Sequence, residues 1–352
     1  MSKNPRKCLL YANCIPVKGV KNSIICDLQR QNYVQIPNGL YEILSDHRGK
    51  DIEEIKSFYN NEYDDIIENY FKTLINNEFA FFTDTPELFP EISMEWDEPL
   101  EITNAIVDFD EYSDFDIFSI LEQLSELHCK FIQIRYYNEI KLDDIISILE
   151  YLDQIQSNSI GINFIFPYIN GKIKNDFMSL FTSFKRLNSI AVCGSPIKEI
   201  INITHSKYLI FSEQKIVSEN CCGVIEKEMF SVHIKTFTES QKYNSCLNRK
   251  ISIDKKGDIR NCPSMSRSFG KIDQVTLKEA LYHADFKVFW KVNKDQIDIC
   301  KDCEFRYICT DCRAYTSDPS SETSKPLKCG YDPYSGVWEP WSQNELKNIA
   351  RK

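Results

Sequence analysis

The sequence predicts an α/β multidomain fold with three successive parts. Short segments rich in β-branched and aromatic residues come first, and three amphipathic helices follow them, a pattern typical of a small winged-helix-like unit. From about residue 100 to 240, strand and helix patterns alternate, which indicates a parallel sheet or a partial (β/α) barrel. Seven cysteines then form one ordered array in the last third of the chain, and such an array indicates a centre for a soft metal.

Composition limits the classes of function. The chain has 352 residues, of which 42% are hydrophobic and 27% charged, so it is long enough for two or three globular domains. Because the net charge is −10 and no basic stripe alternates with aromatic residues, we expect no nucleic-acid partner. No apolar run is long enough to cross a bilayer, and residues 1–7 are polar and basic. We therefore expect a cytoplasmic protein without a membrane partner.

The first part, residues 1–90, combines short strands with helices. We expect strands at 11–17, 23–28, 33–36 and 79–82, and helices at 39–45, 51–60 and 64–77. The longest helix carries an apolar stripe, and the one before it starts at an acidic cap. Three prolines, Pro86, Pro90 and Pro99, then mark a linker.

The second part, residues 100–240, contains the alternating elements. We expect strands at 102–109, 131–136, 160–166, 189–193, 208–211 and 231–237, and helices at 116–127 and 142–156. In such folds the chemistry lies at the carboxyl ends of the strands. The loop after the first strand is acidic and has neither cysteine nor glycine, and we expect it to be solvated and to lead into the first turn of a helix. Its acidic residues are Asp108, Asp110, Glu111, Asp114 and Asp116.

The third part, residues 241–352, holds the cysteine array. Cys246 and Cys262 flank a predicted hairpin whose turn contains Gly257, and a capping box at 276–279 starts a helix that we expect to reach residue 291. The remaining thiols follow closely: Cys300, Cys303, Cys309, Cys312 and Cys329. Thiolates select zinc, copper(I) or iron-sulfur clusters, and spacing alone does not separate zinc from iron-sulfur.

The order of these residues resembles the SPASM domain, the auxiliary-cluster domain of many radical SAM enzymes that modify peptides. The family pattern is C-x(9-15)-G-x4-C, then C-x2-C-x5-C-x3-C, then a last cysteine. Here two residues rather than three separate Cys309 from Cys312. The resemblance implies two [4Fe-4S] clusters, with zinc as the alternative. Cluster I would be held by Cys246, Cys262 and Cys312, and cluster II by Cys300, Cys303, Cys309 and Cys329.

Cluster I is one ligand short in this assignment. The family can use a cysteine shortly before the first motif position, but residues 237–245 contain none. Three possibilities remain open. Cys221 or Cys222 supplies the fourth ligand, Glu239 supplies an oxygen, or one iron stays open.

The radical SAM motif C-x3-C-x2-C is absent from the chain. Cys8 and Cys14 are separated by five residues and lie in the first part. The second part therefore resembles a radical SAM barrel that has lost its catalytic cluster, and we expect no S-adenosylmethionine. The chain as a whole resembles the SPASM-domain peptide maturase of grasp-with-spasm systems, through the stretches 23–30, 237–241, 246–252 and 300–315. This resemblance implies a ribosomally made precursor peptide and an ATP-grasp ligase as partners.

The first part is similar to the PqqD-like leader-peptide recognition domain. In that family a leader peptide adds as a strand to a sheet edge and packs against the third helix. The resemblance implies peptide-binding residues on the strand 33–36 and on the helix 64–77. They are Tyr33, Val34, Ile36, Tyr70 and Phe71.

Three functional hypotheses follow. The first is maturation of a ribosomally synthesised, post-translationally modified peptide, with leader binding and two auxiliary clusters but no radical SAM chemistry. The second is a Lewis-acid or redox enzyme that acts on the peptide through an open-site cluster. The third is a zinc-stabilised peptide-binding adaptor. No catalytic residue is assigned, and the sequence leaves open whether the protein is an enzyme.

Overall fold

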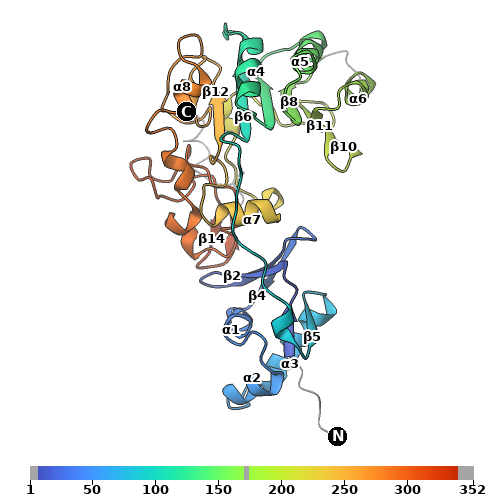
Figure 1. Cartoon of the computed structure of the whole chain (residues 1–352), viewed down its shortest axis with the longest axis vertical. Coiled ribbons are helices and arrows are strands. Elements are labelled where there is room, and N and C mark those ends of the chain that lie inside the picture. The colour runs from blue at the N-terminus through green and yellow to red at the C-terminus, as the bar shows by residue number, and fades with distance from the viewer. Residues whose placement is uncertain (1–6, 170–173, 340–352) are drawn as a thin grey trace.

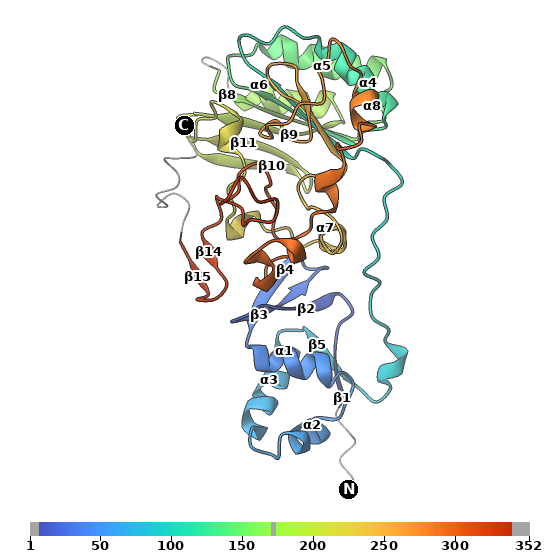
Figure 2. The ribbon, with the colours of Figure 1, turned by 90° about the vertical axis from the view of Figure 1, so that its left-hand side faces the viewer.

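The computed structural model describes residues 7–169 and 174–339. The molecule is elongated, with the N-terminal unit at one end, a large sheet at the other and the cysteine-rich region between them (Figure 1). An extended stretch that follows residue 89 runs along the side of the cysteine-rich region to reach the sheet (Figure 2). The cysteine-rich region therefore separates the N-terminal unit from the large sheet.

The N-terminal unit contains a three-stranded antiparallel sheet of order β2-β3-β4, and β1 pairs with β5 beside it. An Asp51–Glu54 capping box starts the second helix, as the acidic cap predicts. Ile67, Phe71 and Leu74 of the third helix are buried, as its apolar stripe predicts. The elements are β1 (Lys7–Leu10), β2 (Cys14–Lys18), β3 (Ser23–Asp27), β4 (Asn32–Ile36), α1 (Asn38–Asp46), α2 (Ile52–Phe58), α3 (Asp64–Asn76) and β5 (Ala80–Thr83).

The large sheet has eight strands in the order β10-β11-β9-β8-β7-β6-β12-β13. Its neighbouring strands are parallel except at the two ends, where β10–β11 and β12–β13 are antiparallel. The helices α4, α5 and α6 lie on one face of it (Figure 2). Its elements up to β11 are β6 (Asn104–Phe109), α4 (Ile117–Glu126), β7 (Phe131–Tyr136), α5 (Leu142–Gln154), β8 (Gly161–Pro167), α6 (Lys174–Ser183), β9 (Leu187–Cys193), β10 (Glu199–Thr204) and β11 (Lys207–Ser212).

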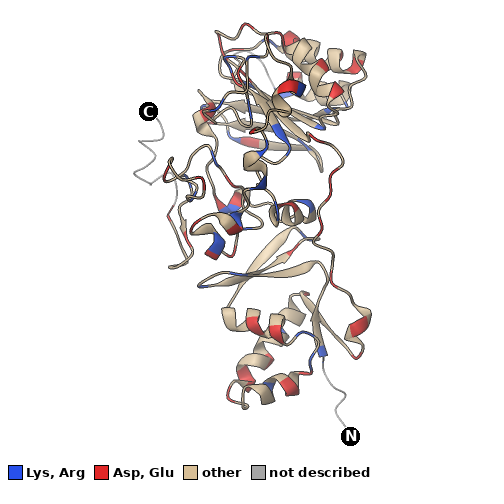
Figure 3. Cartoon of the chain, turned by 60° about the vertical axis from the view of Figure 1, so that its left-hand side comes forward, with Lys and Arg blue, Asp and Glu red and all other residues tan. Residues whose placement is uncertain are grey.

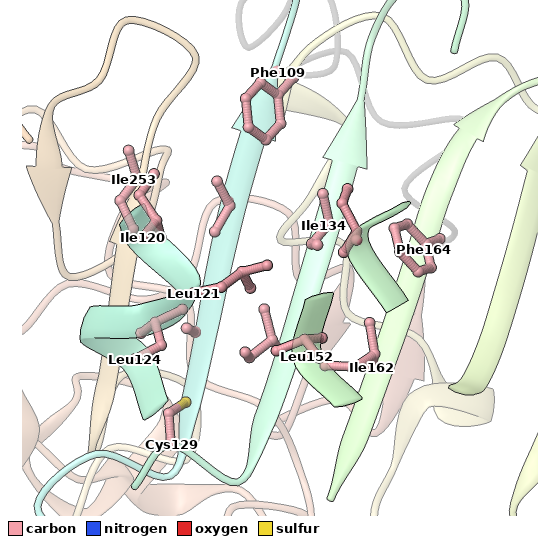
Figure 4. Close-up of a cluster of buried hydrophobic side chains, with 14 of the residues drawn as sticks. Phe109, Ile120, Leu121, Leu124, Cys129, Ile134, Leu152, Ile162, Phe164 and Ile253 are labelled. Carbon is pink, nitrogen blue, oxygen red and sulfur yellow. The ribbon is translucent and has the colours of Figure 1, made fainter. Parts of the chain in front are cut away.

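The main hydrophobic core lies between this sheet and its helices. Leu121 and Leu124 of α4 point toward the sheet, where Ile134 and Phe164 lie on neighbouring strands (Figure 4). All four side chains are fully buried. Along β8, Ile162, Phe164 and Phe166 are fully buried and the residues between them are partly exposed, as expected for a strand with one face packed against helices.

The hairpin β12 (Lys250–Ile253) and β13 (Ile259–Arg260) joins the cysteine-rich region to the sheet. β12 pairs in parallel with β6, with Lys250 opposite Asn104. Cys246 precedes this hairpin and Cys262 follows it, so the sheet fixes the positions of both thiols. The remaining regular elements are α7 (Ile234–Ser240), α8 (Leu277–Leu281), β14 (Tyr331–Asp332), β15 (Val337–Trp338) and short 3-10 turns.

Two sequence predictions are wrong. Residues 231–237 are not a strand, because the His233 ring accepts a hydrogen bond from the Lys235 amide and starts the helix α7, whose Phe237 packs against Tyr307. The helix expected to reach residue 291 ends at Leu281. The helix α6 and the strands β1, β10, β14 and β15 are not among the predicted elements.

The helices of the N-terminal unit carry many acidic side chains (Figure 3). Glu53 and Glu54 lie in the first turn of α2, and Asp64 and Asp65 lie in the first turn of α3, where carboxylates interact favourably with the helix dipole. Such a surface repels a phosphate backbone. Of the helices in the described ranges, none has the length and apolar character needed to cross a bilayer.

The core in Figure 4 gives a stability prediction. Leu121→Ala removes a fully buried side chain and leaves a cavity, so we expect it to lower the free energy of unfolding by about 2–5 kcal/mol. Leu88→Ala is the control, because Leu88 is 69% exposed and its loss should change stability by less than about 0.5 kcal/mol. Urea titration of the full-length chain measures both values, and equal effects would contradict the assignment of this core.

Candidate metal centres

The thiols of the C-terminal region fall into two groups. In the first, Cys246, Cys262 and Cys312 lie close enough for their charges to interact, and Cys222 lies with them. Burial raises the pKa of Cys262 and of Cys312, and the neighbouring thiols of Cys246 and Cys222 raise both further. Three cysteines that the sequence assigns to cluster I are therefore brought together with one of its candidate fourth ligands.

A lysine ammonium lies within the first group. Lys250 Nζ donates a hydrogen bond to Cys246 Sγ at 3.3 Å. Burial lowers the pKa of Lys250, but the thiols of Cys246, Cys262 and Cys222 outweigh burial, and the pKa is raised overall. The ammonium is thus stabilised by sulfur rather than by a carboxylate.

The second group contains the four cysteines assigned to cluster II. The charges of Cys300, Cys309 and Cys329 interact, and burial raises the pKa of Cys300 and Cys309. Cys303 belongs with them, because burial and then the thiols of Cys309 and Cys300 contribute to its strongly raised pKa. Each of these four thiols therefore influences at least one other electrostatically, and their ligation of a common centre stays a prediction.

The second group also encloses a lysine. Lys294 is 4% exposed, and its Nζ lies 3.7 Å from a carboxylate oxygen of Asp311. Burial lowers its pKa, but Cys309, Cys300 and Asp311 raise it more. Asp311 also accepts a bond of 2.7 Å from the buried guanidinium of Arg313. One carboxylate therefore faces two buried cations, so electroneutrality requires negative charge from the thiols.

A polar network connects the two groups. The Asn244 side chain accepts bonds from the amides of Cys246 and Leu247 and donates to Asp311 at 2.7 Å. The Ser245 hydroxyl donates to the Cys309 carbonyl and accepts from the Asp311 amide. The residues just before Cys246 therefore fix the chain around Cys309, and the positions of the two groups depend on each other.

The candidate fourth ligands differ in position. Glu239 accepts a hydrogen bond of 2.7 Å from Asn248 and lies near Lys235. The Cys221 thiol points toward the Lys215 carbonyl oxygen, at 3.9 Å, and its charge contributes to the raised pKa of Cys193. Of these three candidates, only Cys222 contributes to the raised pKa values of both Cys262 and Cys312.

Both groups fit a soft metal in donor type and charge. Within residues 7–169 and 174–339, no set of three or more His, Cys, Asp or Glu side chains is already arranged to hold a metal ion. Each group nevertheless supplies the sulfur donors that zinc and iron-sulfur centres prefer. Each also holds an ammonium that needs anionic sulfur beside it, and a bound metal keeps cysteine in its thiolate form.

The carboxyl ends of β6 and β7 carry a buried ion pair. Asp108 lies opposite Arg135 in the parallel register, and the two side chains form a bidentate pair at 2.6 and 2.7 Å. The Tyr137 hydroxyl donates to the same carboxylate at 2.8 Å. Asp108 and its hydrogen bonds raise the pKa of Arg135 despite burial. Paired, buried polar side chains therefore occupy the carboxyl ends of β6 and β7.

The expectation for the acidic loop after β6 is right at one position and wrong at another. Asp116 caps α4 through bonds to the amides of Phe118 and Ser119, as expected for a helix start. Asp108, however, is 1% exposed and not solvated. A charged residue near the end of an otherwise apolar strand, repeated as Arg135 on the next strand, is the signal that could have identified this pair. Spacing gave no comparable signal for Lys250 or Lys294.

The candidate peptide-binding residues occupy two places. Val34, Ile36, Tyr70 and Phe71 contribute to the hydrophobic core of the N-terminal unit, and Ile36 and Phe71 are buried within it. Tyr33 instead packs against Phe305 and Phe230, with ring centroids 5.5 and 5.9 Å apart. Leader binding by these residues stays a prediction.

No family model and no curated protein matches the chain. Among solved structures, it is similar to BtrN in an open conformation, with 10% identity and a TM-score of 0.34 over 57% of this chain and 92% of that one. It is also similar to Streptococcus suis SuiB bound to S-adenosylmethionine, with 12% identity and a TM-score of 0.35 over 91% and 98% of the two chains. SuiB bound to the precursor peptide SuiA gives 11% identity and a TM-score of 0.26 over 87% and 96%.

The buried pair at the strand ends gives a stability prediction. Arg135→Met leaves the Asp108 carboxylate buried and unpaired, and we expect a loss of about 3–5 kcal/mol in the free energy of unfolding. The double variant Asp108→Leu/Arg135→Met removes both charges and should be clearly more stable than the single one. Urea unfolding of the two full-length variants measures the difference. A double variant that is less stable than the single variant would contradict the view that the unpaired Asp108 carboxylate causes the loss of stability.

Proposed function

We propose that this chain takes part in the maturation of a ribosomally made peptide, by binding the precursor leader and by holding two [4Fe-4S] clusters. The observation that carries the proposal is the sorting of eight thiols into two groups of four, each with a lysine beside the sulfurs. The order of seven of these cysteines and the placement of Gly257 favour iron-sulfur over zinc, through the resemblance to the SPASM domain. When bound, such clusters supply one-electron transfer.

The chain's own residues would tune these clusters. A hydrogen bond to a thiolate sulfur shifts the reduction potential of an iron-sulfur cluster. Lys250 is in position to make such a bond to Cys246 Sγ. Lys294 is shared with Asp311, so its charge is partly compensated. The two clusters would therefore have different potentials, which suits a component that passes electrons in one direction.

We propose that radical SAM chemistry is not part of this activity. The loop after β6, where that chemistry needs three cysteines, contains none. The adjoining strand ends are closed by the Asp108–Arg135 pair and by Tyr137. The chain would thus act as a presenter, scaffold or electron-transfer component beside an ATP-grasp ligase in the cytoplasm.

Leader binding would use the free edge of β4. This strand is at the end of the three-stranded sheet, and no other strand in the described residues pairs with its outer edge. An added peptide strand would gain backbone hydrogen bonds there and could place apolar side chains near α3, where Tyr70 is partly buried. The opposite side of the same sheet touches the second thiol group through Tyr33 and Phe305. The N-terminal unit would therefore present the peptide close to a cluster.

Metal analysis tests the cluster proposal. Protein purified without oxygen should contain labile sulfide and about eight iron atoms per chain, the content of two [4Fe-4S] clusters. We expect a brown protein that bleaches in air. Stoichiometric zinc without labile sulfide would contradict iron-sulfur binding and favour the zinc-stabilised adaptor.

Leader binding has its own test. Tyr70→Ala removes a partly buried aromatic side chain of α3 and should weaken binding of a labelled precursor from the same gene neighbourhood by roughly 5- to 30-fold. Tyr63→Ala is the control, because Tyr63 immediately precedes the same helix and is 50% exposed. Fluorescence anisotropy with the full chain measures both affinities. Equal affinities, or no binding by the unmodified chain, would remove this part of the proposal.

A further inference from the structure

We infer that Cys222 is the fourth ligand of cluster I, so that this cluster is ligated by four cysteines and has no open iron. The inference rests on the proposed function, because it concerns the same cluster. Its ligand would come from the loop that leaves the large sheet after β11, and not from the segment just before Cys246. Cluster I would then join the sheet to the cysteine-rich region.

The loop of residues 218–225 is held in place on several sides. Lys328 Nζ donates to the carbonyl oxygens of Asn220 and Cys222 at 2.6 and 2.7 Å. The Ile225 amide donates to the Lys328 carbonyl at 3.2 Å. The Tyr315 hydroxyl donates to the Asn220 side chain at 2.7 Å. Because Tyr315 follows Cys312 and Lys328 precedes Cys329, chain segments from both thiol groups fix the position of Cys222.

Gly223 allows the close approach that a shared ligand set needs. Its φ is +86°, a conformation that L side chains rarely adopt. A Cβ atom at this position would lie 3.0 Å from Cys312 Sγ and 3.0 Å from the Tyr315 ring. The backbone directly after Cys222 therefore lies against the Cys312 sulfur, and a Cβ atom here would fit only if Cys312 or Tyr315 moved.

The two adjacent cysteines face different surroundings. The Cys221 thiol points toward the Lys215 carbonyl and Cys193, on the side of the sheet. Cys222 is exposed and directly precedes Gly223, whose Cβ position lies 3.0 Å from Cys312 Sγ, and its thiol contributes to the raised pKa of Cys262 and of Arg135. Cys221 is the last residue of the 3-10 turn Glu219–Cys221, whereas the backbone at Cys222 is extended, with φ −82° and ψ 168°, so the backbone conformation changes between the two cysteines. One of the pair is thus a ligand and the other is not.

The ligand set changes the chemistry available at cluster I. Cys222 would bind as a thiolate and release its proton, as metal ligation by cysteine requires. Four thiolates saturate a [4Fe-4S] cluster, so no iron remains to bind a peptide group as a Lewis acid. Cluster I would then transfer electrons, with Lys250 hydrogen-bonded to its Cys246 sulfur.

A matched pair of variants tests the assignment. In full-length protein purified without oxygen, Cys222→Ala should lose about half of the iron and labile sulfide, whereas Cys221→Ala should keep both. Alkylation with iodoacetamide and mass spectrometry gives a second readout. In loaded wild-type protein Cys222 should stay unmodified and become modified after chelation of the metal, while modification of Cys221 should not change. Equal iron in the two variants, with Cys222 alkylated in the loaded protein, would overturn the inference and leave the two clusters intact.

A glycine variant tests the same contact without removing a thiol. Gly223→Ala should also lower iron and sulfide toward half, because its Cβ would displace Cys312 or the loop. Gly194→Ala is the control, since Gly194 has φ +70° but its Cβ would meet only the flexible Lys215 side chain, at 3.3 Å. Equal iron in these two variants would count against the close packing of Cys222 and Cys312. Wild-type protein without labile sulfide would instead overturn the proposed function, and the alkylation pattern of Cys222 would still decide the ligand assignment.

Discussion

Two lysine ammonium groups in the cysteine-rich region need negative charge beside them, and the arrangement of the neighbouring thiols depends on this requirement. Lys250 hydrogen-bonds to a sulfur, and Lys294 shares one carboxylate with Arg313. A buried cation without an opposing charge costs several kcal/mol. Thiolates oppose such cations, and a bound metal keeps cysteine in the thiolate form. Folding of this region and metal binding are therefore expected to be coupled.

This coupling extends to the N-terminal unit. The face of its three-stranded sheet that lies away from α1–α3 shares a hydrophobic cluster with the cysteine-rich region, in which Tyr33 and Ile24 meet Phe305 and Ile308. Phe305 lies between Cys303 and Cys309, so it is held by the same chain segment that forms the second thiol group. The Gln35 side chain adds a polar contact to Glu304 at 3.4 Å. A change in the ligation of the second group would thus be transmitted directly to β4, the strand that we propose receives the leader.

Sequence periodicity predicted the elements whose burial is regular, such as α5, expected at 142–156 and observed at Leu142–Gln154. Periodicity gave the wrong structure where tertiary contacts determine the conformation. The segment with Val232, Ile234 and Phe237 has the composition of a strand. The helix α7 forms there instead, and its Phe237 packs against Tyr307. Cysteine order predicts two ligand sets, and thiols within each set influence one another electrostatically in the structure. The fourth ligand of the first set is the position that the order leaves open. That position depends on a loop from another part of the chain, and only the fold distinguishes Cys222 from Cys221. The lysines were missed because a lysine carries no spacing signal.

The loop that carries Cys222 also explains how the carboxyl edge of the large sheet is closed. Lys255 Nζ lies 3.6 Å from Glu219 and 3.8 Å from Asp110, so the loop before Cys222 is tied to the loop after β6. The Asp108–Arg135 pair fills the strand ends beneath them, and Arg135 is itself within reach of the charge of Cys222. In a parallel sheet this edge is where a reactive centre would normally be exposed to substrate. Here ion pairs occupy the same edge and hold the loop before Cys222, and we propose that they position Cys222 for a metal centre.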